Sequence, residues 1–482
     1  MAERADQVGA DTGLGTDFSL LIGGELVRGD ERLDVINPAT GEVFAQAPAA
    51  GRAQLDQAVQ AARAAFETWR AMTYGQRAEL IRAFSAKLRE RQNELAELLT
   101  REQGKPLAQS IAEIDRGAAQ SDGMVTIEIP VEVLIDDAER RIELKYRPLG
   151  VVGIITPWNA PVNLALGPLV SALYTGNTAV LKPSPYTPLT TLKLGEIARE
   201  IFPPGVVNVL AGGDDLGRWI TEHEGIDKIS FTGSVATGKK VAAAAAATLK
   251  RVTLELGGND PAIILDDVDP KAIAKKVFFA SFVNSGQVCM AIKRIYAHEK
   301  IYAALCDALV EEAGKAKVGN GLDPDTQLGP IQNRMQYEKL LDILEDTKRS
   351  GARILCGGEV PEGPGYFFPP TLVTDIDERS RLVREEQFGP IVPILRFSDI
   401  EDAIRRANDT RYGLSGSVWT SDPERGKAIA ERLEVGTAWV NQHRATSAFV
   451  PFGGAKESGL GRQYSIVGLK GYMEPAVISV AK

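Results

Sequence analysis

Two stretches near the start of the chain place apolar residues at helical spacing. Between positions 53 and 69 these residues recur every three or four positions, and the same period returns between positions 80 and 98. A period of 3.6 residues gathers the apolar side chains on one helix face, which packs against a core. We therefore expect two long amphipathic helices, preceded by a loose arm over the Gly- and Asp-rich residues 1–20.

Beyond position 150 the pattern changes to short apolar runs separated by helical patterns. Because these runs lack strict alternation, helices are expected to cover both faces of their sheet, as in a doubly wound parallel sheet. A second series begins near position 300 and predicts a further α/β unit. The first runs are VVGII (151–155), TAVLK (178–182), VVNVL (206–210), KISF (228–231) and VTLEL (252–256); the second are ARILC, PIVPIL, SGSVW and GTAWV, among helical patterns at 300–317, 332–349, 400–408 and 423–433.

The composition of the 482-residue chain excludes several classes of function. Lys and Arg total 55 against 64 Asp and Glu, a net charge of −9, and no basic block is present to bind a nucleic-acid backbone. No run of about 18 apolar residues occurs, and the first residues lack the basic start and apolar core of an export signal. We expect neither a nucleic-acid partner nor a membrane partner.

The histidines and cysteines are few and widely spaced. No two of the 3 histidines lie close together, which argues against a His-ligated zinc site, and no metal is expected. The 3 cysteines form neither a CxxC pair nor an even disulfide framework. A reducing, cytoplasmic setting is therefore expected.

A phosphate-binding turn is predicted between residues 228 and 240. The segment KISFTGSVATGKK has the pattern of a strand, a glycine-containing turn and a helix start, whose free backbone N–H groups favour an anion. Residues 233–239 match GxxxxGK, but Lys240 stands where a P-loop has Ser or Thr, so a nucleotide-hydrolysing P-loop is disfavoured. A plain helix cap by Ser234 is the alternative interpretation.

A cysteine and a glutamate are candidates for covalent catalysis. Cys289 follows the polar, flexible residues NSGQV, whereas Cys306 and Cys356 are typical of inert buried thiols. Glu255 ends an apolar run and precedes two glycines. A buried carboxyl group there has the raised pKa that a general base needs near neutral pH.

An amide is the third candidate. Asn159 lies just beyond the strand predicted at 151–155, in the segment TPWNAP. Ligands of open α/β sheets gather at the carboxyl ends of strands, so this amide is placed to meet a developing oxyanion. An Asx-turn between two prolines is the alternative. The segment EEQFGP at 385–390 joins two acids to an aromatic residue and is a weak signal alone.

Together these segments resemble the aldehyde dehydrogenase superfamily, over nearly the whole chain from about Leu20. The shared motifs are PWN, KPS, FTGS, LELGG, GQVC, EEQFGP and PFGGAKESGLGR, in the order and spacing of that family. The resemblance implies that Cys289 attacks an aldehyde, that Asn159 and the Cys289 backbone N–H hold the oxyanion, and that Glu255 activates the water that hydrolyses the thioester. It implies hydride transfer to NAD, with NADP as the alternative.

The resemblance also implies further contacts. Lys182 and Glu386 match positions that hold cofactor ribose hydroxyls, and Ser234 matches a pyrophosphate contact. The full implied cofactor set is Thr156, Trp158, Lys182, Ser184, Gly212, Gly233, Ser234, Leu256, Glu386 and Phe388, and the implied substrate tunnel consists of Ala160, Asn163, Gly167, Met290 and Phe452.

The family's organisation implies an α/β fold with three parts. A Rossmann-type cofactor domain would take residues 1–128 and 147–256, and an α/β catalytic domain residues 257–456. A small β oligomerisation element would take residues 129–146 and 457–482, so a homodimer or homotetramer is expected.

Some positions depart from the family's common pattern. Pro185 stands where NAD-preferring members usually carry an acid near the adenosine 2′-hydroxyl, so the choice between NAD and NADP stays open. Ala160, Asn163 and Gly167 are small where members acting on small aldehydes are often bulky. A wide tunnel and a substrate larger than acetaldehyde are therefore expected.

Two other functions remain as alternatives. A CoA-acylating enzyme would typically lack the glutamate that matches Glu255. A non-catalytic binding protein on the same scaffold would have lost Cys289 or Glu255. The chain retains both residues.

Overall fold

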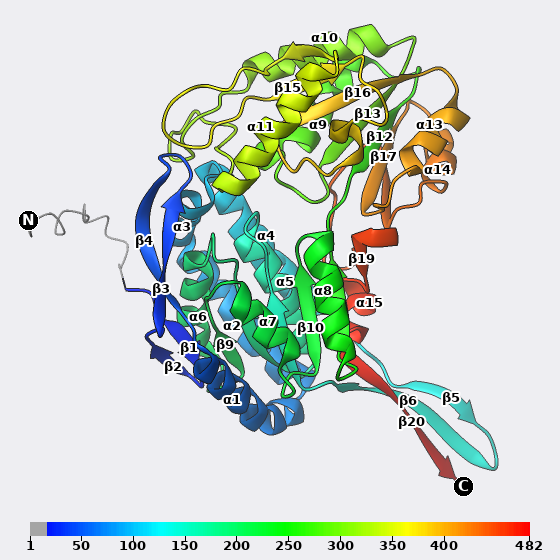
Figure 1. Ribbon diagram of the computed structural model, residues 1–482. Helices are drawn as coiled ribbons and strands as arrows, with labels where there is room; N and C mark the ends of the chain where they lie inside the picture. Colours follow the sequence, from blue (N-terminus) through cyan, green and yellow to red (C-terminus); the bar gives the residue numbers. More distant parts are fainter. Residues whose placement is uncertain (1–16) are drawn as a thin grey trace, which may run out of the picture.

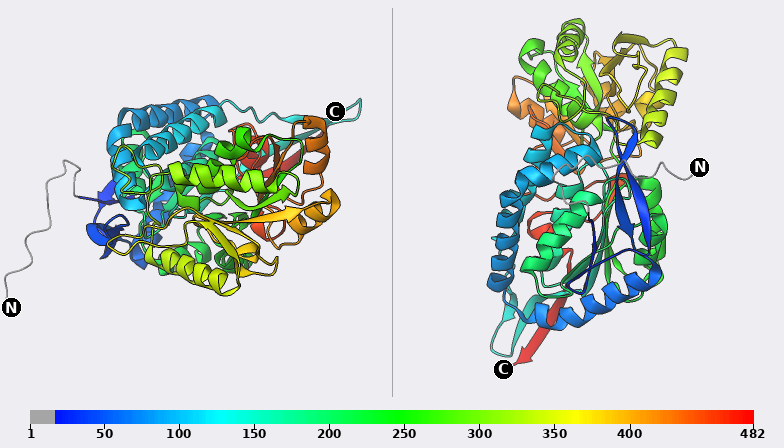
Figure 2. Two further views of the ribbon diagram at one scale, coloured as in Figure 1. Left: turned by 90° about the horizontal axis from the view of Figure 1, so that it is seen from above. Right: turned by 90° about the vertical axis from the view of Figure 1, so that its left-hand side faces the viewer.

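The computed structural model describes residues 17–482, so most of the predicted N-terminal arm lies outside the described residues. Two α/β bodies stand one above the other, and a narrow three-stranded sheet projects from the lower one (Figure 1). Seen from the side, this sheet points away from the upper body (Figure 2). The predicted α/β fold class is confirmed.

The lower body is built on an eight-stranded sheet with the order β19-β11-β10-β7-β8-β9-β1-β2. Its five central strands are parallel and confirm the five predicted apolar runs, whereas the remaining strands pair antiparallel at the two edges. The strands are β1 (Leu20–Ile22), β2 (Glu25–Val27), β7 (Val151–Ile155), β8 (Thr178–Lys182), β9 (Val207–Val209), β10 (Lys228–Thr232), β11 (Arg251–Glu255) and β19 (Gly459–Leu460).

Helices pack on this sheet and share one core with it. The prediction of a single helix over 80–98 is wrong, because Arg91 leaves the helical backbone region (φ −97°, ψ 15°) and separates two helices. This break allows the second helix, residues 92–103, to pack against both α6 (Leu189–Ile201) and the strand β3 (Glu31–Asn37). The helices are α1 (Arg52–Ala71), α2 (Tyr74–Glu90), α3 (Gln92–Gln103), α4 (Leu107–Met124), α5 (Pro161–Tyr174), α6 (Leu189–Ile201), α7 (Asp214–Glu222) and α8 (Val235–Ala246).

The upper body is built on a seven-stranded sheet with the order β14-β15-β16-β13-β12-β17-β18, parallel except for β14. Its apolar cores are separate from that of the lower body. The strands are β12 (Asp260–Ile264), β13 (Ile292–His298), β14 (Arg353–Cys356), β15 (Thr371–Thr374), β16 (Ile391–Phe397), β17 (Ser415–Trp419) and β18 (Thr437–Val440). The helices are α9 (Pro270–Phe282), α10 (Tyr302–Lys315), α11 (Arg334–Arg349), α12 (Arg381–Arg384), α13 (Ile400–Asn408) and α14 (Pro423–Ala430), with the 3-10 turn η1 (Val283–Gly286) after α9.

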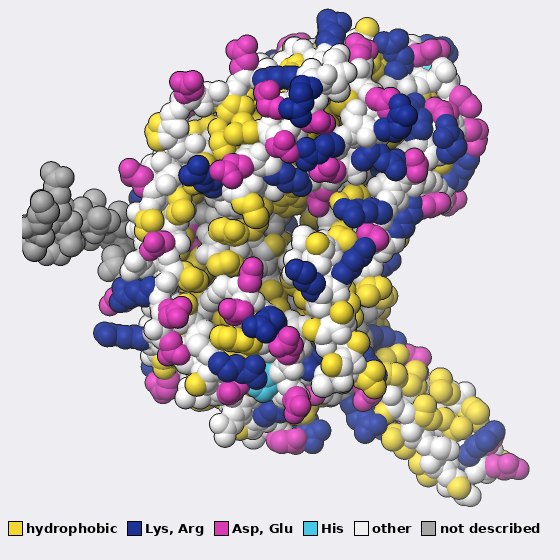
Figure 3. Space-filling view, in the orientation of Figure 1, with side chains coloured by type: hydrophobic (Ala, Val, Ile, Leu, Met, Phe, Trp, Pro, Cys, Tyr) yellow, Lys and Arg dark blue, Asp and Glu magenta, His cyan; other side chains and the backbone are white. Residues whose placement is uncertain are grey.

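The projecting arm joins three strands in the order β20-β6-β5. They are β5 (Glu132–Asp136), β6 (Arg140–Pro148) and β20 (Met473–Ala481), and β20 pairs with β6 from Met473 opposite Pro148 to Ala481 opposite Arg140. Hydrophobic side chains spread over its exposed face (Figure 3). The smaller elements are the hairpin β3 (Glu31–Asn37) and β4 (Glu42–Ala49), η2 (Lys456–Ser458) and α15 (Ser465–Lys470).

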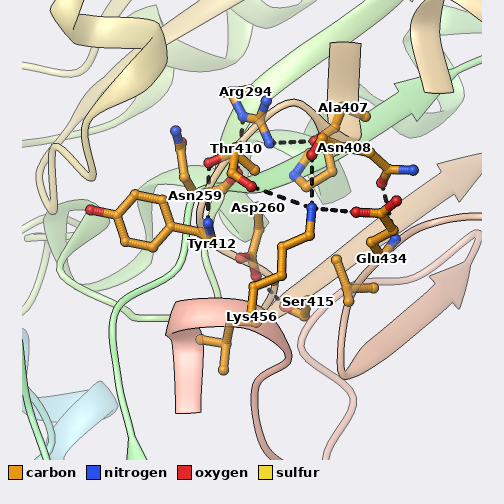
Figure 4. A pocket seen from close by; sticks show the side chains of 14 residues that line it. Asn259, Asp260, Arg294, Ala407, Asn408, Thr410, Tyr412, Ser415, Glu434 and Lys456 are labelled. Atoms are coloured by element: carbon orange, nitrogen blue, oxygen red, sulfur yellow. Dashed lines mark hydrogen bonds and ion pairs between the residues drawn. The ribbon is translucent and has the colours of Figure 1, made fainter. Parts of the chain in front are cut away.

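A buried arginine secures the edge of the upper sheet where the chain returns to the lower body. The side chain of Arg294, only 2% exposed, donates to the carbonyl oxygens of Asn259 and Ala407, each at 2.9 Å. Nearby, Lys456 Nζ donates to the carbonyl oxygen of Asn408 at 2.8 Å and pairs with Glu434 (Figure 4). These cations hold the loop after α13 through its backbone carbonyls.

We expect Arg294→Met to lower the free energy of unfolding by about 3 kcal/mol, because it leaves several buried carbonyl oxygens without donors. Urea denaturation followed by tryptophan fluorescence measures the loss, since Trp419 is buried in the same body. Arg349→Met, on the exposed end of α11, is the control and should change stability by less than about 0.5 kcal/mol. Equal stability of the two variants would contradict this role of Arg294.

Candidate active site

The candidate nucleophile lies on a sharply turned segment between α9 and β13. Asn284, Ser285 and Gly286 all have left-handed backbone angles, with φ of 52°, 54° and 72°. A Cβ atom on Gly286 would lie 2.4 Å from the carbonyl oxygen of Gly389, so only glycine fits there. The turn brings Cys289 beside residues of α4 and α5, which belong to the lower body.

The fully buried side chain of Gln287 fixes this turn. Its Nε2 donates to the carbonyl oxygens of Asn284 at 2.9 Å and Pro330 at 3.3 Å, and its Oε1 accepts from the Gln332 N–H at 2.8 Å. Its own carbonyl oxygen accepts a hydrogen bond from Nδ2 of Asn159 at 3.0 Å. The candidate oxyanion donor is thus joined to the segment that carries the nucleophile, and the second N–H of its amide is left to meet a ligand.

A buried ion pair between Lys105 and Glu113 holds the backbone of Asn159. Lys105 Nζ also donates to the carbonyl oxygen of Asn159 at 2.9 Å. Glu113 Oε1 accepts from the backbone N–H groups of Val162 and Asn163 at 2.9 and 3.2 Å. The first turn of α5 is therefore fixed to α4 by charge-assisted hydrogen bonds.

The half-buried Cys289 opens on a cavity of about 140 Å³. Burial raises the pKa of its thiol to about 12, although the nearby Lys293 ammonium acts in the opposite direction. Lys293 is itself buried and donates to the carbonyl oxygens of Val288, at 3.0 Å, and Cys289. The thiol is uncharged at neutral pH and needs a base before it can attack.

Glu255 supplies a carboxyl group suited to that task. It ends β11, is 7% exposed, and neither of its carboxyl oxygens has a hydrogen-bond partner among the described residues. Burial raises its pKa well above 4.5, and Arg462 is the cation that opposes this shift. A Cβ atom on Gly453 would lie 2.8 Å from Glu255 Oε1, so glycine keeps space open at the carboxyl group. Such a group can exchange protons near neutral pH.

The predicted cofactor residues gather at the carboxyl edge of the lower sheet. Thr156, Lys182, Gly212, Gly233 and Leu256 end or follow the five parallel strands β7 to β11. Burial lowers the pKa of Lys182 to about 8, and its Nζ donates to the carbonyl oxygen of Pro183 at 3.3 Å. The Oγ1 atom of Thr156 is buried and has no hydrogen-bond partner among the described residues. A buried ammonium group with one carbonyl acceptor and a buried hydroxyl group without a partner fit a ligand that brings hydroxyl or phosphate oxygens.

The turn that the sequence predicts to bind phosphate lies between β10 and the start of α8. Ser234 is exposed and caps the helix, because its Oγ accepts from the Thr237 N–H at 3.2 Å. The alternative interpretation as a helix cap is therefore confirmed. A cap and an anion contact are compatible, since the remaining backbone N–H groups of the first turn still point outward.

The upper body contributes two predicted cofactor residues, Glu386 and Phe388, whereas Trp158 and Ser184 follow β7 and β8 of the lower body. Glu386 Oε1 accepts from the Gly258 N–H at 3.1 Å and lies 3.6 Å from Lys293 Nζ. Phe388, with φ of 52°, packs edge-on against Trp158 at 5.3 Å between ring centroids. Aromatic residues from both bodies thus meet beside the carboxyl edge of the lower sheet.

The predicted substrate tunnel agrees only partly with the cavity. Ala160, Asn163 and Met290 line it, whereas Gly167 and Phe452 do not. A Cβ atom on Gly167 would lie 3.2 Å from Tyr464 Oη, so the C-terminal segment fills the space that the missing side chain leaves. Gly167 therefore does not widen this cavity.

Several residues of the site escaped the sequence analysis. Lys105, Glu113 and Gln287 position the catalytic candidates, and two arginines, Arg116 and Arg444, line the cavity. The sequence does contain a signal for Glu113, because this acid lies on the apolar face of α4 together with Ile114 and other buried residues. No local pattern distinguishes the two arginines from solvated ones.

Two further observations bear on the class of protein. Among residues 17–482, no group of three or more His, Cys, Asp or Glu side chains is arranged to hold a metal ion. No helix in this part of the chain is both long and apolar enough to cross a membrane.

Comparisons with known proteins agree on one family. The family model described as "Aldehyde dehydrogenase family" matches residues 26–478. Aldehyde dehydrogenase LUC3 of Fusarium sp is 39% identical, over 97% of this chain and 99% of its own, and the chloroplastic betaine aldehyde dehydrogenase of Beta vulgaris is 38% identical, over 92% and 91%. An NAD+ complex of an aldehyde dehydrogenase from Bacillus cereus superposes with a TM-score of 0.94 at 37% identity, with 97% of each chain covered. The chain belongs to the aldehyde dehydrogenase family.

Proposed function

We propose that this protein oxidises an aldehyde to the carboxylic acid with NAD+, through a covalent intermediate on Cys289. One observation carries the proposal: a thiol and an amide are fixed to each other through the Gln287 carbonyl at one cavity. A buried carboxyl group without hydrogen-bond partners, Glu255, stands close enough to influence the thiol's pKa. The related Bacillus cereus structure is an NAD+ complex, which supports the choice of cofactor.

Each side chain of the site has its own role in the proposed reaction. Cys289 Sγ bonds to the aldehyde carbon while the thiol proton leaves toward Glu255, directly or through water. The free N–H of Asn159 and the Cys289 backbone N–H hold the resulting oxyanion. A bound NAD+ would supply the hydride acceptor that converts this adduct to a thioester. Once Glu255 has released the first proton to solvent, it can take a proton from water while the hydroxide attacks the thioester carbon. The acid then leaves, and Glu255 returns this proton to the Cys289 thiolate.

The cofactor contacts are part of the same proposal. Lys182 and Glu386 would hold ribose hydroxyls, Ser234 the pyrophosphate, and Trp158 and Phe388 the cleft walls. Ser184, Gly212 and the other predicted residues would complete the site on residues 1–128 and 147–256, with residues 257–456 as the catalytic domain. The buried Lys182 ammonium and the Thr156 hydroxyl, which has no hydrogen-bond partner among the described residues, support this assignment.

The projecting arm is proposed as the oligomerisation element. Its outer strands expose Val133, Leu134, Val477 and Val480, each at least 48% accessible. Exposed apolar side chains on edge strands favour pairing with another chain. We propose a homodimer or homotetramer. Three free cysteines support a reducing, cytoplasmic setting.

The other two functions account for fewer of the site's features. A CoA-acylating enzyme gives Glu255 no role in thioester hydrolysis, and a binding protein needs neither the thiol nor the carboxyl group. Both groups are present and share one environment. The aldehyde-oxidising reaction gives each of them a role.

Cys289→Ala should reduce aldehyde oxidation at least about 1,000-fold, because it removes the atom that forms the covalent bond. NADH fluorescence in the steady state measures the rate, and titration of NADH fluorescence shows that cofactor binding persists. Cys356→Ala removes a thiol remote from the cavity and is the control. Retention of more than about a tenth of the wild-type rate would contradict the assignment.

Glu255→Gln should slow hydride transfer and block hydrolysis more strongly, since the amide can take a proton neither from the thiol nor from water, while the more acidic thiol can still lose its proton to solvent. We expect a burst of NADH of up to one equivalent per site in stopped-flow measurements, followed by a slow steady state. Intact mass spectrometry should detect the acylated enzyme. A normal steady-state rate without a burst would remove Glu255 from this role.

The protein should prefer NAD over NADP by less than about 1,000-fold in kcat/KM, or roughly 4 kcal/mol. Pro185 brings no negative charge that would repel a 2′-phosphate, and Lys182 is a buried cation three positions earlier. Initial rates with both cofactors give the ratio. A larger preference would show that another element rejects the phosphate.

A further inference from the structure

Two arginine side chains in the Cys289 cavity have no acidic partner. Arg116 comes from α4 and Arg444 from the loop after β18, so both bodies contribute one. Neither forms an ion pair or a side-chain hydrogen bond with any other residue in the range 17–482. The cavity's remaining charges, Lys105 and Glu113, neutralise each other.

Arg444 is held firmly in this position. Its own backbone is left-handed, with φ of 66°, and the preceding His443 ring bonds through Nε2 to the carbonyl oxygen of Met290 at 2.9 Å. Trp439 packs against this ring at 4.8 Å and donates from Nε1 to the Ala445 carbonyl oxygen at 3.2 Å. The Arg444 loop is thus attached to the residue next to the nucleophile.

The position of the Arg444 guanidinium group is electrostatically unfavourable. Its Nε atom is buried and has no hydrogen-bond acceptor among the described residues. Burial lowers the pKa of Arg444 to about 10, and the neighbouring positive charge of Arg116 contributes to the shift. A buried donor without an acceptor is costly, and repulsion from the exposed Arg116 adds to this cost unless an anion lies between the two cations.

Arg116 faces the cavity because of its helical spacing. Gln109, Ala112, Glu113 and Arg116 line the same wall, at the i, i+3, i+4 and i+7 positions of one helix face. Glu113, the acid on that face, is already bonded to Lys105 and to two backbone N–H groups. It is therefore not available as a partner for Arg116.

We propose that the substrate is an aldehyde that carries a carboxylate, and that Arg116 and Arg444 bind this carboxylate while Cys289 attacks the aldehyde carbon. The inference rests on the proposed oxidation at Cys289 and names its substrate class. Guanidinium groups match the planar carboxylate and hold it through paired hydrogen bonds. The same two charges repel a cationic aldehyde. The betaine aldehyde and aminoaldehyde dehydrogenases among the relatives therefore differ from this protein in the substrates they are named for.

The first test compares aldehydes of matched length and different charge. Values of kcat/KM are measured for butanal and 4-oxobutanoate, hexanal and 6-oxohexanoate, benzaldehyde and 4-formylbenzoate, and for betaine aldehyde. We expect at least one carboxylate to exceed its neutral partner about 100-fold, and betaine aldehyde to be the poorest substrate. A neutral aldehyde preferred in every pair, or betaine aldehyde preferred to butanal, would overturn the proposal.

Single variants assign the effect to the arginines. Arg444→Gln and Arg116→Gln should each lower the carboxylate-to-neutral ratio of kcat/KM at least about tenfold, chiefly through KM. Arg349→Gln, on the exposed end of α11, is the matched control and should leave the ratio unchanged. An unchanged ratio in both cavity variants would overturn the assignment.

A second measurement does not depend on turnover. Two methanethiosulfonate reagents, one with a sulfonatoethyl and one with a trimethylammonioethyl group, modify Cys289, and peptide mass spectrometry follows each rate. The ratio of the sulfonate rate to the ammonium rate should fall at least about tenfold in Arg444→Gln and Arg116→Gln. An unchanged ratio contradicts an anion-binding cavity. Loss of all aldehyde oxidation with this ratio still dependent on the arginines would reject the proposed reaction and keep the anion site.

Discussion

The buried ion pair between Lys105 and Glu113 connects the candidate oxyanion donor to the segment that carries the nucleophile. Through Lys105 it holds the carbonyl of Asn159, and the Asn159 amide in turn bonds the carbonyl of Gln287, two residues before Cys289. Removing either charge would leave the other buried and unpaired, which is strongly destabilising. One electrostatic contact in the lower body therefore determines where a nucleophile of the upper body lies.

Burial shifts the pKa of the nucleophile and of the base in the same direction. It raises the pKa of the Cys289 thiol to about 12 and that of the Glu255 carboxyl group well above its usual value, so each group favours its protonated form. Proton transfer between them creates a thiolate without changing the net charge of the cavity. The permanent charges are left to Lys293 beneath the nucleophile and to the two arginines in the cavity wall. The groups that exchange a proton, Cys289 and Glu255, are thus distinct from the charged groups that orient the reactants.

The sequence predicted those features of the fold and the site that depend on residues close together along the chain. Continuous apolar runs identified the five parallel strands because both of their faces are covered, and residues just after those strands, such as Asn159 and Lys182, had to meet at one edge. Contacts between distant segments were not predictable in this way. The break at Arg91 depends on the packing of α3 against α6, and Tyr464 fills the space beside Gly167 from nearly 300 positions away. The two cavity arginines were missed for the same reason, because only the fold shows that no acidic side chain pairs with them among the described residues.

The short strand β19 delays completion of the lower body during synthesis. Its antiparallel pairing of Gly459 with Glu255 and of Leu460 with Leu254 closes the edge of a sheet whose five parallel strands all precede the upper body in the chain. At 5–20 residues per second, a ribosome needs roughly 10–40 s to make the intervening stretch of about 200 residues. During that time β11 presents an open edge, and Glu255 lacks its final surroundings. The nascent chain therefore passes through a stage in which Cys289 has already been made but the carboxyl group of Glu255 is not yet enclosed.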